Sequence, residues 1–87
     1  MAKLFDVSIL TPLKTVYKGK ASSLVAPAQT GYLGILADHA PMVTTIGNGK
    51  ISLKEESGST RTILCQGKGL LEVVNNQVTL LLEVGAA

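Results

Sequence analysis

The chain has 87 residues, with eight Lys and Arg against six Asp and Glu, and its formal net charge is +2. Hydrophobic residues make up 46% of it and charged residues 16%, which excludes a disordered segment and indicates one compact domain. So small a net charge gives no indication of a partner selected by charge alone, such as a nucleic acid or an anionic membrane surface.

The chain holds a single cysteine, Cys65, and a single histidine, His39. One cysteine excludes an internal disulfide, and these two side chains are too few for the three or four ligands of a zinc site. We therefore expect no metal and no cofactor. The longest apolar stretch, around Leu80, is far shorter than the roughly 18 residues that cross a bilayer. Charges at Lys3 and Asp6 interrupt the apolar run that a signal peptide requires, which predicts a cytosolic chain.

Glycine and proline divide the sequence at short intervals, a spacing typical of an all-β domain. Phe5, Val7 and Ile9 alternate with polar residues, as in a strand with one buried face. No window has the i, i+3, i+4 apolar repeat of a helix. We predict an all-β fold, a small β-sandwich of about nine to ten short strands in two sheets. The predicted strands are Lys3–Leu10, Leu13–Lys18, Ala21–Ala26, Gly31–Leu36, Met42–Ile46, Lys50–Lys54, Thr60–Gln66, Leu70–Val74 and Gln77–Val84.

Several of the connections have residues that favour a turn. Gly47-Asn48-Gly49 contains the Asn-Gly pair of a tight hairpin, in which both residues adopt positive φ at low cost. Asn75-Asn76 also tolerates left-handed backbone and predicts a second hairpin. Pro27–Thr30 is predicted to form a turn, and Gly19 to separate the two strands that flank it.

Some predicted strands are apolar on both faces, whereas a half-buried strand has one polar face. A chain of this length does not bury both faces of two sheets by itself. We therefore expect apolar surface to remain for a partner. The alternative is that bends and sheet corners cover these side chains within the domain. The apolar side chains that alternate with another apolar set are Val25, Val43, Leu70, Val74 and Leu81.

The sequence lacks the motifs of common enzyme sites. Gly67-Lys68-Gly69 has neither the spacing nor the following helix of a phosphate-binding loop, and no Gly-x-Ser-x-Gly elbow occurs. Glu55 and Glu56 are adjacent, which favours solvated turn charges over an acid/base pair. Cys65 lies in an apolar strand, which favours a buried and unreactive thiol. We expect no catalytic residue and no enzymatic activity of the chain itself.

Nucleic-acid binding by a small β-domain uses aromatic side chains on a basic groove. The chain has one Phe and two Tyr, of which Phe5 belongs to the expected core, and the lysines of Lys14–Lys20 are typical of a protected sheet edge. His39 has no second catalytic or ligating residue beside it. We interpret it as a side chain that holds its loop or meets a partner's backbone, with Asp38 orienting the ring or capping the turn.

The segment Gly31–Pro41 resembles the Gly-x-Leu/Phe-Gly-Ile-x-x-x-His-Ala-Pro signature of the epsilon subunit family of the F-type ATP synthase. Further segments are similar to that family in the same order along the chain, and the resemblance covers residues 3 to 84. Several ordered motifs at the expected spacing are more specific than any one of them. These segments are Leu4–Leu10, Val16–Gly19, Thr44–Ile51, Gly67–Val73 and Asn76–Thr79.

The resemblance implies a β-sandwich domain over residues 1–84 with a tail at 85–87. It also implies a non-catalytic rotor subunit of the central stalk, which docks on the gamma subunit and the c-ring and couples rotation to proton-driven ATP synthesis. Such a subunit lies peripherally at the cytoplasmic face of the bacterial inner membrane and binds no nucleic acid. The implied gamma contacts are Thr11, His39, Ala40, Pro41 and Met42, and the implied c-ring contacts are Gln29, Thr30, Gly31, Tyr32 and Leu33.

Three positions depart from the family pattern. Tyr32 and Asp38 stand where the family usually has Glu and Gly, and Lys68 replaces a Gly. Most members of the family continue into a hairpin of two α-helices with inhibitory and ATP-binding roles. This sequence ends at Ala87, where that hairpin would begin, so we expect neither role from it, whether the chain is naturally short or a piece of a longer one.

Two other classes of function stay open at this point. A biotin- or lipoyl-carrier domain is also small and rich in strands, but it requires an exposed Lys at a hairpin tip, and Asn48-Gly49 and Asn75-Asn76 hold the clearest tips. An oligonucleotide-binding barrel would bind single-stranded nucleic acid in a salt-dependent manner, and we expect no such binding.

Overall fold

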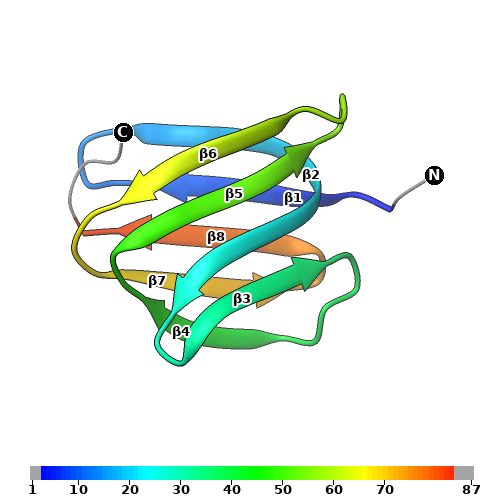
Figure 1. The fold of residues 1–87 in the computed structure, drawn as a ribbon. Helices are drawn as coiled ribbons and strands as arrows, with labels where there is room; N and C mark the ends of the chain where they lie inside the picture. The colour runs from blue at the N-terminus through cyan, green and yellow to red at the C-terminus, as the bar shows by residue number, and fades with distance from the viewer. Residues whose placement is uncertain (1–2, 84–87) are drawn as a thin grey trace.

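The computed structural model describes residues 3–83, which form eight β-strands in two packed layers (Figure 1). One layer contains β1, β8, β7 and β4, and the other contains β3, β2, β5 and β6. The all-β sandwich predicted from the sequence is therefore confirmed. No helix in this part of the chain is long and apolar enough to cross a membrane. The strands are β1 (Phe5–Leu10), β2 (Thr15–Ala28), β3 (Gly31–Leu36), β4 (Met42–Ile46), β5 (Gly49–Glu55), β6 (Thr60–Cys65), β7 (Gly69–Val74) and β8 (Gln77–Leu82).

The long strand β2 joins the two layers. Its first half pairs antiparallel with β1, and its second half lies between β5 and β3. The register shifts between Ala21 and Ser23, and such an irregularity bends a strand, here from one layer into the other. At its end Ala28 pairs with Ile46 of β4, so the two layers are hydrogen-bonded to each other at both ends of β2.

Two of the predicted strands, Leu13–Lys18 and Ala21–Ala26, merge into this one strand, which begins at Thr15, so Leu13 and Lys14 belong to the turn before it. Gly19 does not separate them, because it pairs with Val7 inside the β1–β2 ladder. Pro27 also lies within β2, so the predicted turn is reduced to Gln29-Thr30. The expectation of about nine to ten strands thus becomes eight in residues 3–83, and the last predicted residue, Val84, lies outside the described part.

The predicted tight hairpin at Gly47-Asn48-Gly49 is wrong. β4 pairs with β7 and β2, whereas β5 pairs with β2 and β6, so this segment crosses from one layer to the other. The connection from β6 to β7 also crosses between the layers, and Asn48 holds it in place. The Asn48 Oδ1 accepts a 2.6 Å hydrogen bond from the backbone N–H of Gly67 in that connection. An Asn-Gly pair is a local signal, and it does not reveal which strands pair at a distance.

The predicted hairpin at Asn75-Asn76 is confirmed. The two residues have φ of 49° and 59°, the left-handed pair that suits a two-residue turn between twisted strands. From this turn β7 and β8 run antiparallel, and β8 then pairs parallel with β1. The β4–β7–β8–β1 layer is therefore a mixed sheet.

The core lies between the layers and is made by every second residue of most strands. Phe5, Val7 and Ile9 of β1 are at most 2% exposed, as the alternation predicted. No polar or charged side chain is buried among residues 3–83. Cys65 belongs to this core, and burial raises the pKa of its thiol, which keeps it protonated and unreactive.

We predict that Gly49→Ala destabilises the domain and that Gly34→Ala does not. Gly49 has a φ of 150°, and a Cβ there would lie 2.8 Å from both Pro27 Cβ and Tyr32 Oη. The strain should lower the free energy of unfolding by about 1–3 kcal/mol, measured by urea denaturation. Gly34 has open space at its Cβ position, so Gly34→Ala should be neutral or stabilise by up to about 1 kcal/mol. Equal losses in the two variants would contradict this reading.

Candidate partner-binding surface

The turns gather at two opposite ends of the sandwich, and the sequence-predicted contact residues are divided between them (Figure 1). At the left of Figure 1 lie the β1–β2 and β2–β3 turns, and we call this the Gln29 end. At the right lies the loop 37–41 that joins β3 to β4, beside the Asn75-Asn76 turn, and we call this the Asp38 end. The strand register agrees, because Ile46 pairs with Ala28 near one end and Met42 pairs with Val73 near the other.

The residues expected to contact a c-ring lie together at the Gln29 end. Gln29, Thr30, Gly31 and Tyr32 are exposed, whereas Leu33 is half-buried and packs against the core. Gly31 has a φ of 128°, a conformation that favours glycine. The Tyr32 side chain is 63% exposed, and its Oη accepts a 3.3 Å hydrogen bond from the backbone N–H of Lys50. The turn thus presents a surface without charged side chains.

His39 is half-buried and holds its own loop, as the sequence suggested. Its Nδ1 lies 2.7 Å from the carbonyl oxygen of Ala40, and since a carbonyl only accepts, Nδ1 carries the proton and donates it. Pro41 and Ala40 are exposed, and Met42 is half-buried against the core. The ring therefore rigidifies the loop at the Asp38 end.

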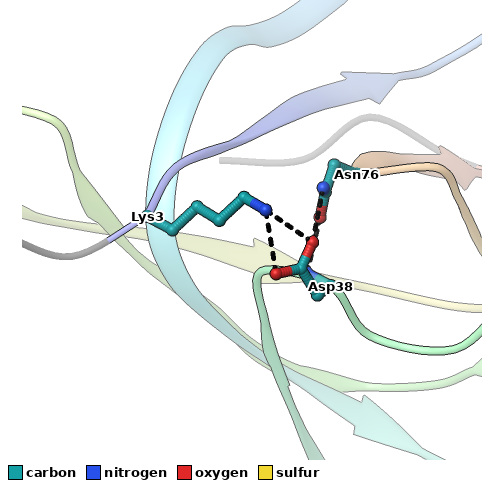
Figure 2. Close-up of polar contacts among 3 residues, drawn as sticks. All are labelled: Lys3, Asp38 and Asn76. Carbon is teal, nitrogen blue, oxygen red and sulfur yellow. Dashed lines mark hydrogen bonds and ion pairs between the residues drawn. The ribbon is translucent and has the colours of Figure 1, made fainter.

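Asp38 does not orient the His39 ring; it connects the loop to two other segments (Figure 2). Its carboxylate accepts hydrogen bonds from Lys3 Nζ at 2.9 Å on both oxygens and from Asn76 Nδ2 at 3.0 Å. Its backbone N–H donates to Asn76 Oδ1 at 2.6 Å. The Asn76 amide and then Lys3 hold the pKa of this carboxyl below its ordinary value. With a φ of 66°, Asp38 adopts the left-handed conformation that Gly adopts freely.

Thr11 lies at the Gln29 end, away from the other four residues expected to contact gamma. Its Oγ1 accepts hydrogen bonds from the backbone N–H groups of Leu13 and Lys14, which closes the β1–β2 turn. Between Thr11 and Met42 lie three inter-strand spacings and four residues along the strands, roughly 14 Å across and 13 Å along the sheet. The structure therefore does not bring these five residues into one cluster.

The outer face of the β4–β7–β8–β1 layer carries exposed apolar side chains between Thr11 and the 37–41 loop, interrupted by the exposed Glu72 that pairs with Val43. Leu70 and Leu81 are directly paired across β7 and β8, and Leu81 continues the row to Leu10 of β1. Val43, near the 37–41 loop, is 63% exposed. The expectation that apolar side chains remain exposed is confirmed at Val25, Val43, Leu70, Val74 and Leu81.

A second apolar region lies on the β3–β2–β5–β6 layer. Val25 of β2 pairs with Gly34 of β3, which has no side chain to cover it, and Tyr32 and Leu36 stand on either side along β3. Exposure of Leu36, which is 65% exposed, was not predicted, because the alternation along β3 is interrupted by its two glycines. The contact of Asn76 with Asp38 was not predicted either, since residues 38 positions apart share no local signal.

The remaining ionisable groups form only surface pairs in the described part of the chain. Glu55 accepts a hydrogen bond from Arg61 at 3.2 Å, and Lys20 contacts Asp6 at 3.0 Å. Such exposed pairs contribute little to stability. Residues 3–83 contain no group of three side chains that could hold a metal ion.

The fold and its surface thus define a small mixed β-sandwich domain that keeps apolar side chains on the outside of both layers. The chain belongs to the family of the ATP synthase delta/epsilon chain, beta-sandwich domain, whose model matches residues 4–85.

Curated relatives agree with this family. The chain is 39% identical over 85 residues to an ATP synthase epsilon chain of Leptospira borgpetersenii, covering 98% of this chain and 65% of that protein. It is 43% identical over 75 residues to an ATP synthase epsilon chain of Synechococcus, covering 86% and 53%. The chain therefore spans between about half and two thirds of the length of these relatives.

Solved structures show the same fold. A chain of the Euglena gracilis mitochondrial ATP synthase, in a structure of its OSCP, F1 and c-ring, matches with a TM-score of 0.84 and 17% identity, over 93% of this chain and 51% of that one. A chain from the central stalk and c-ring of the Tetrahymena thermophila enzyme matches with a TM-score of 0.75 and 17% identity, over 95% and 66%.

We predict that Asp38→Asn lowers the melting temperature at neutral pH and that the difference vanishes in acid. The folded-state pKa of Asp38 is below its ordinary value of 3.8, so the carboxylate stabilises the fold above that value. This stabilisation is lost as the pH falls from 3.8 through the folded-state pKa. Asn tolerates the left-handed backbone, so the substitution changes mainly the charge.

The measurement is a series of melting curves of both proteins between neutral pH and acid. Asp6→Asn is the control, because the Asp6 carboxylate bonds to Lys20 alone in the described residues and Asp6 lies in ordinary strand backbone. A constant difference between wild type and Asp38→Asn at all pH values would refute the role of the charge.

Proposed function

We propose that this domain is a non-catalytic rotor component in the central stalk of a proton-translocating F-type ATP synthase. It docks on the gamma subunit and on the c-ring, and it couples rotation to ATP synthesis by holding the two together. The observation that carries this proposal is the exposed apolar outer face of the β4–β7–β8–β1 layer, which an isolated domain would leave in water. Membership of the delta/epsilon family supports it.

The gamma subunit is proposed to cross the outer face of this layer on a diagonal. Thr11 and His39 mark its two ends, and the apolar row of Leu70 and Leu81 lies between them. This arrangement accounts for contact residues at opposite ends of the strands.

The c-ring is proposed to contact the Gln29 end, through Gln29, Thr30, Gly31, Tyr32 and Leu33. Because Tyr32 Oη accepts from Lys50 N–H, its own hydrogen is available for a partner acceptor. A hydrogen bond from Tyr32 then replaces the ion pair that a Glu at this position would form. Such a contact is less sensitive to salt than an ion pair between exposed charges.

The proposed location is peripheral, at the cytoplasmic face of a bacterial inner membrane. This location is favoured because two of the relatives come from bacteria, Leptospira and Synechococcus. A further relative is a cyanelle protein of Cyanophora paradoxa, so an organelle membrane is the alternative location. We assign no inhibitory or ATP-sensing role to residues 3–83, which form strands and turns alone.

A carrier domain is a poorer interpretation of the same fold. Biotin and lipoyl groups are attached to a Lys at an exposed hairpin tip. The two-residue hairpin turns in the described part of the chain are Gln29-Thr30 and Asn75-Asn76, and neither contains Lys.

We predict that Leu81→Glu weakens association with the gamma subunit without unfolding the domain. Leu81 is 47% exposed at the centre of the proposed interface, so a carboxylate there would be desolvated on docking. We expect at least about a tenfold loss of affinity, because a buried unpaired charge costs well over the 1.4 kcal/mol that corresponds to tenfold.

The control for this experiment is Leu64→Glu. Leu64 is 40% exposed but lies on β6 in the other layer, so its substitution should leave association unchanged. Association is measured by co-purification of each tagged variant with the detergent-solubilised ATP synthase, and the fold by cooperative thermal melting. An unchanged yield of Leu81→Glu in the complex would remove the proposed gamma face.

We predict that the purified domain does not hydrolyse ATP. Its described residues form no cluster of metal ligands, and hydrolysis of a nucleoside triphosphate requires a bound divalent cation and groups that position the phosphates. The measurement is phosphate release with Mg²⁺ and ATP. Turnover that follows the protein through successive purification steps would overturn the non-catalytic assignment.

A further inference from the structure

β3 is an edge strand of the sandwich. It pairs with β2 along its whole length, from Ser23–Leu36 to Ala28–Gly31, and no other strand of residues 3–83 pairs with it. Figure 1 shows it at the outer margin of its layer, between the Gln29 end and the 37–41 loop. Its far side therefore carries backbone groups that no strand of the described chain satisfies.

The position of Pro27 identifies these groups. Pro27 has no N–H, and its carbonyl oxygen accepts from the N–H of Gly47, on the side of β2 away from β3. The pair Pro27–Tyr32 is thus not hydrogen-bonded, and such pairs alternate with bonded ones in an antiparallel ladder. Since no register shift interrupts β2 and β3, Tyr32, Gly34 and Leu36 direct their N–H and C=O groups outward.

Gly34 has no role that its own chain explains. It lacks a positive φ, and nothing lies within 4 Å of the position a Cβ would occupy. Glycine inside a strand costs about 0.5–1 kcal/mol relative to alanine. A glycine in such a strand often marks the close approach of another backbone. Here that approach can come only from outside the described chain.

The β3 edge also lacks the features that keep strands apart. Edge strands are commonly protected by charged residues, proline or a bulge, and Gly31–Leu36 has none of these. The edge strand of the opposite margin, β6, carries Arg61 and is mostly polar on its exposed positions. The β3 edge is therefore open to pairing, and its lack of charge matches an uncharged segment.

We propose that β3 accepts an extended, uncharged segment of a neighbouring stalk subunit as an additional strand. The added strand bonds to the outward groups of Tyr32, Gly34 and Leu36, and its side chain beside Gly34 covers the exposed Val25. This inference rests on the proposed function, because β3 connects the Gln29 end to the 37–41 loop. The gamma subunit, which is proposed to contact the 37–41 loop at the end of β3, has its backbone within reach of this strand.

A second copy of this chain is the less suitable occupant. Pairing of two β3 edges would cover little beyond the edge itself and the side chains of Tyr32 and Leu36. A stable dimer needs about 800 Å² per partner. A gamma subunit already held at the 37–41 loop and on the outer face of the other layer needs no such area from the edge alone.

Hydrogen exchange of single amides tests the proposal with an internal control. The full-length protein is exchanged in D₂O free and within the assembled ATP synthase, and site-resolved mass spectrometry follows each amide. We expect the amides of Tyr32, Gly34 and Leu36 to exchange at least about 100-fold more slowly in the assembly. The amides of Leu33 and Ile35, which bond to β2 in both states, are protected throughout.

A set of substitutions tests the same point by assembly. Gly34→Pro removes one outward N–H without removing a bond to β2, and it should lower recovery of the chain in the complex by at least about tenfold. Gly34→Ala keeps that N–H but places a Cβ where the partner backbone approaches, so it should lower recovery less than Gly34→Pro does. Thr62→Pro is a matched control on the opposite edge strand, β6. Ser52 directs its backbone groups to Val25 of β2, so the N–H of its partner Thr62 points outward and proline there breaks no bond within the sheet. This variant should assemble normally.

The outcomes separate this inference from the proposed function. If the chain enters the complex but the amides of Tyr32, Gly34 and Leu36 stay unprotected, strand addition is overturned and the proposed function stands. Failure of the wild-type chain to enter the complex overturns both. If the same amides become protected in the free chain, and this protection rises with the chain's concentration, then a second copy occupies the edge. That result overturns the neighbouring subunit as the occupant.

Discussion

The whole structure depends on how little surface eight short strands can hide. With a single core between two layers, each strand buries one face, and whatever stands on the opposite face meets water. Leu70 and Leu81 are therefore exposed for the same geometric reason that Leu71 and Leu80 are buried. Apolar outer residues in so small a domain are a permanent feature of its surface, and their contact with water costs free energy.

Local periodicity predicted most of the strands because burial on one face leaves a mark every two residues. The ranges of β3 and β4 agree with the structure to the residue, and Phe5, Val7 and Ile9 are buried as expected. The pairing of strands was less accessible. Asn48-Gly49 has the composition of a hairpin, yet its flanking strands have partners elsewhere, and Gly19 is compatible with both a break and a continuous ladder.

The candidate surface was predictable in part. Exposure of Val43 and Leu81 follows from their places opposite a buried set, and the resemblance named the turns at both ends. The separation of Thr11 from His39 required the strand order, because it depends on the path of β2, whose two flanking turns both lie at the Gln29 end. The bonds between Asp38 and Asn76 depend on a contact across 38 positions, which composition and spacing do not encode.

The path of β2 has a mechanical consequence. Its 14 residues run through both sheets, so a load applied to one of them reaches the other along a covalent backbone and not merely across interdigitated side chains. For one sheet to slide over the other, the hydrogen bonds of β2 with β1 and with β5 would have to break together. Under such a load a domain built this way bends as one body, because its two sheets cannot slide past each other.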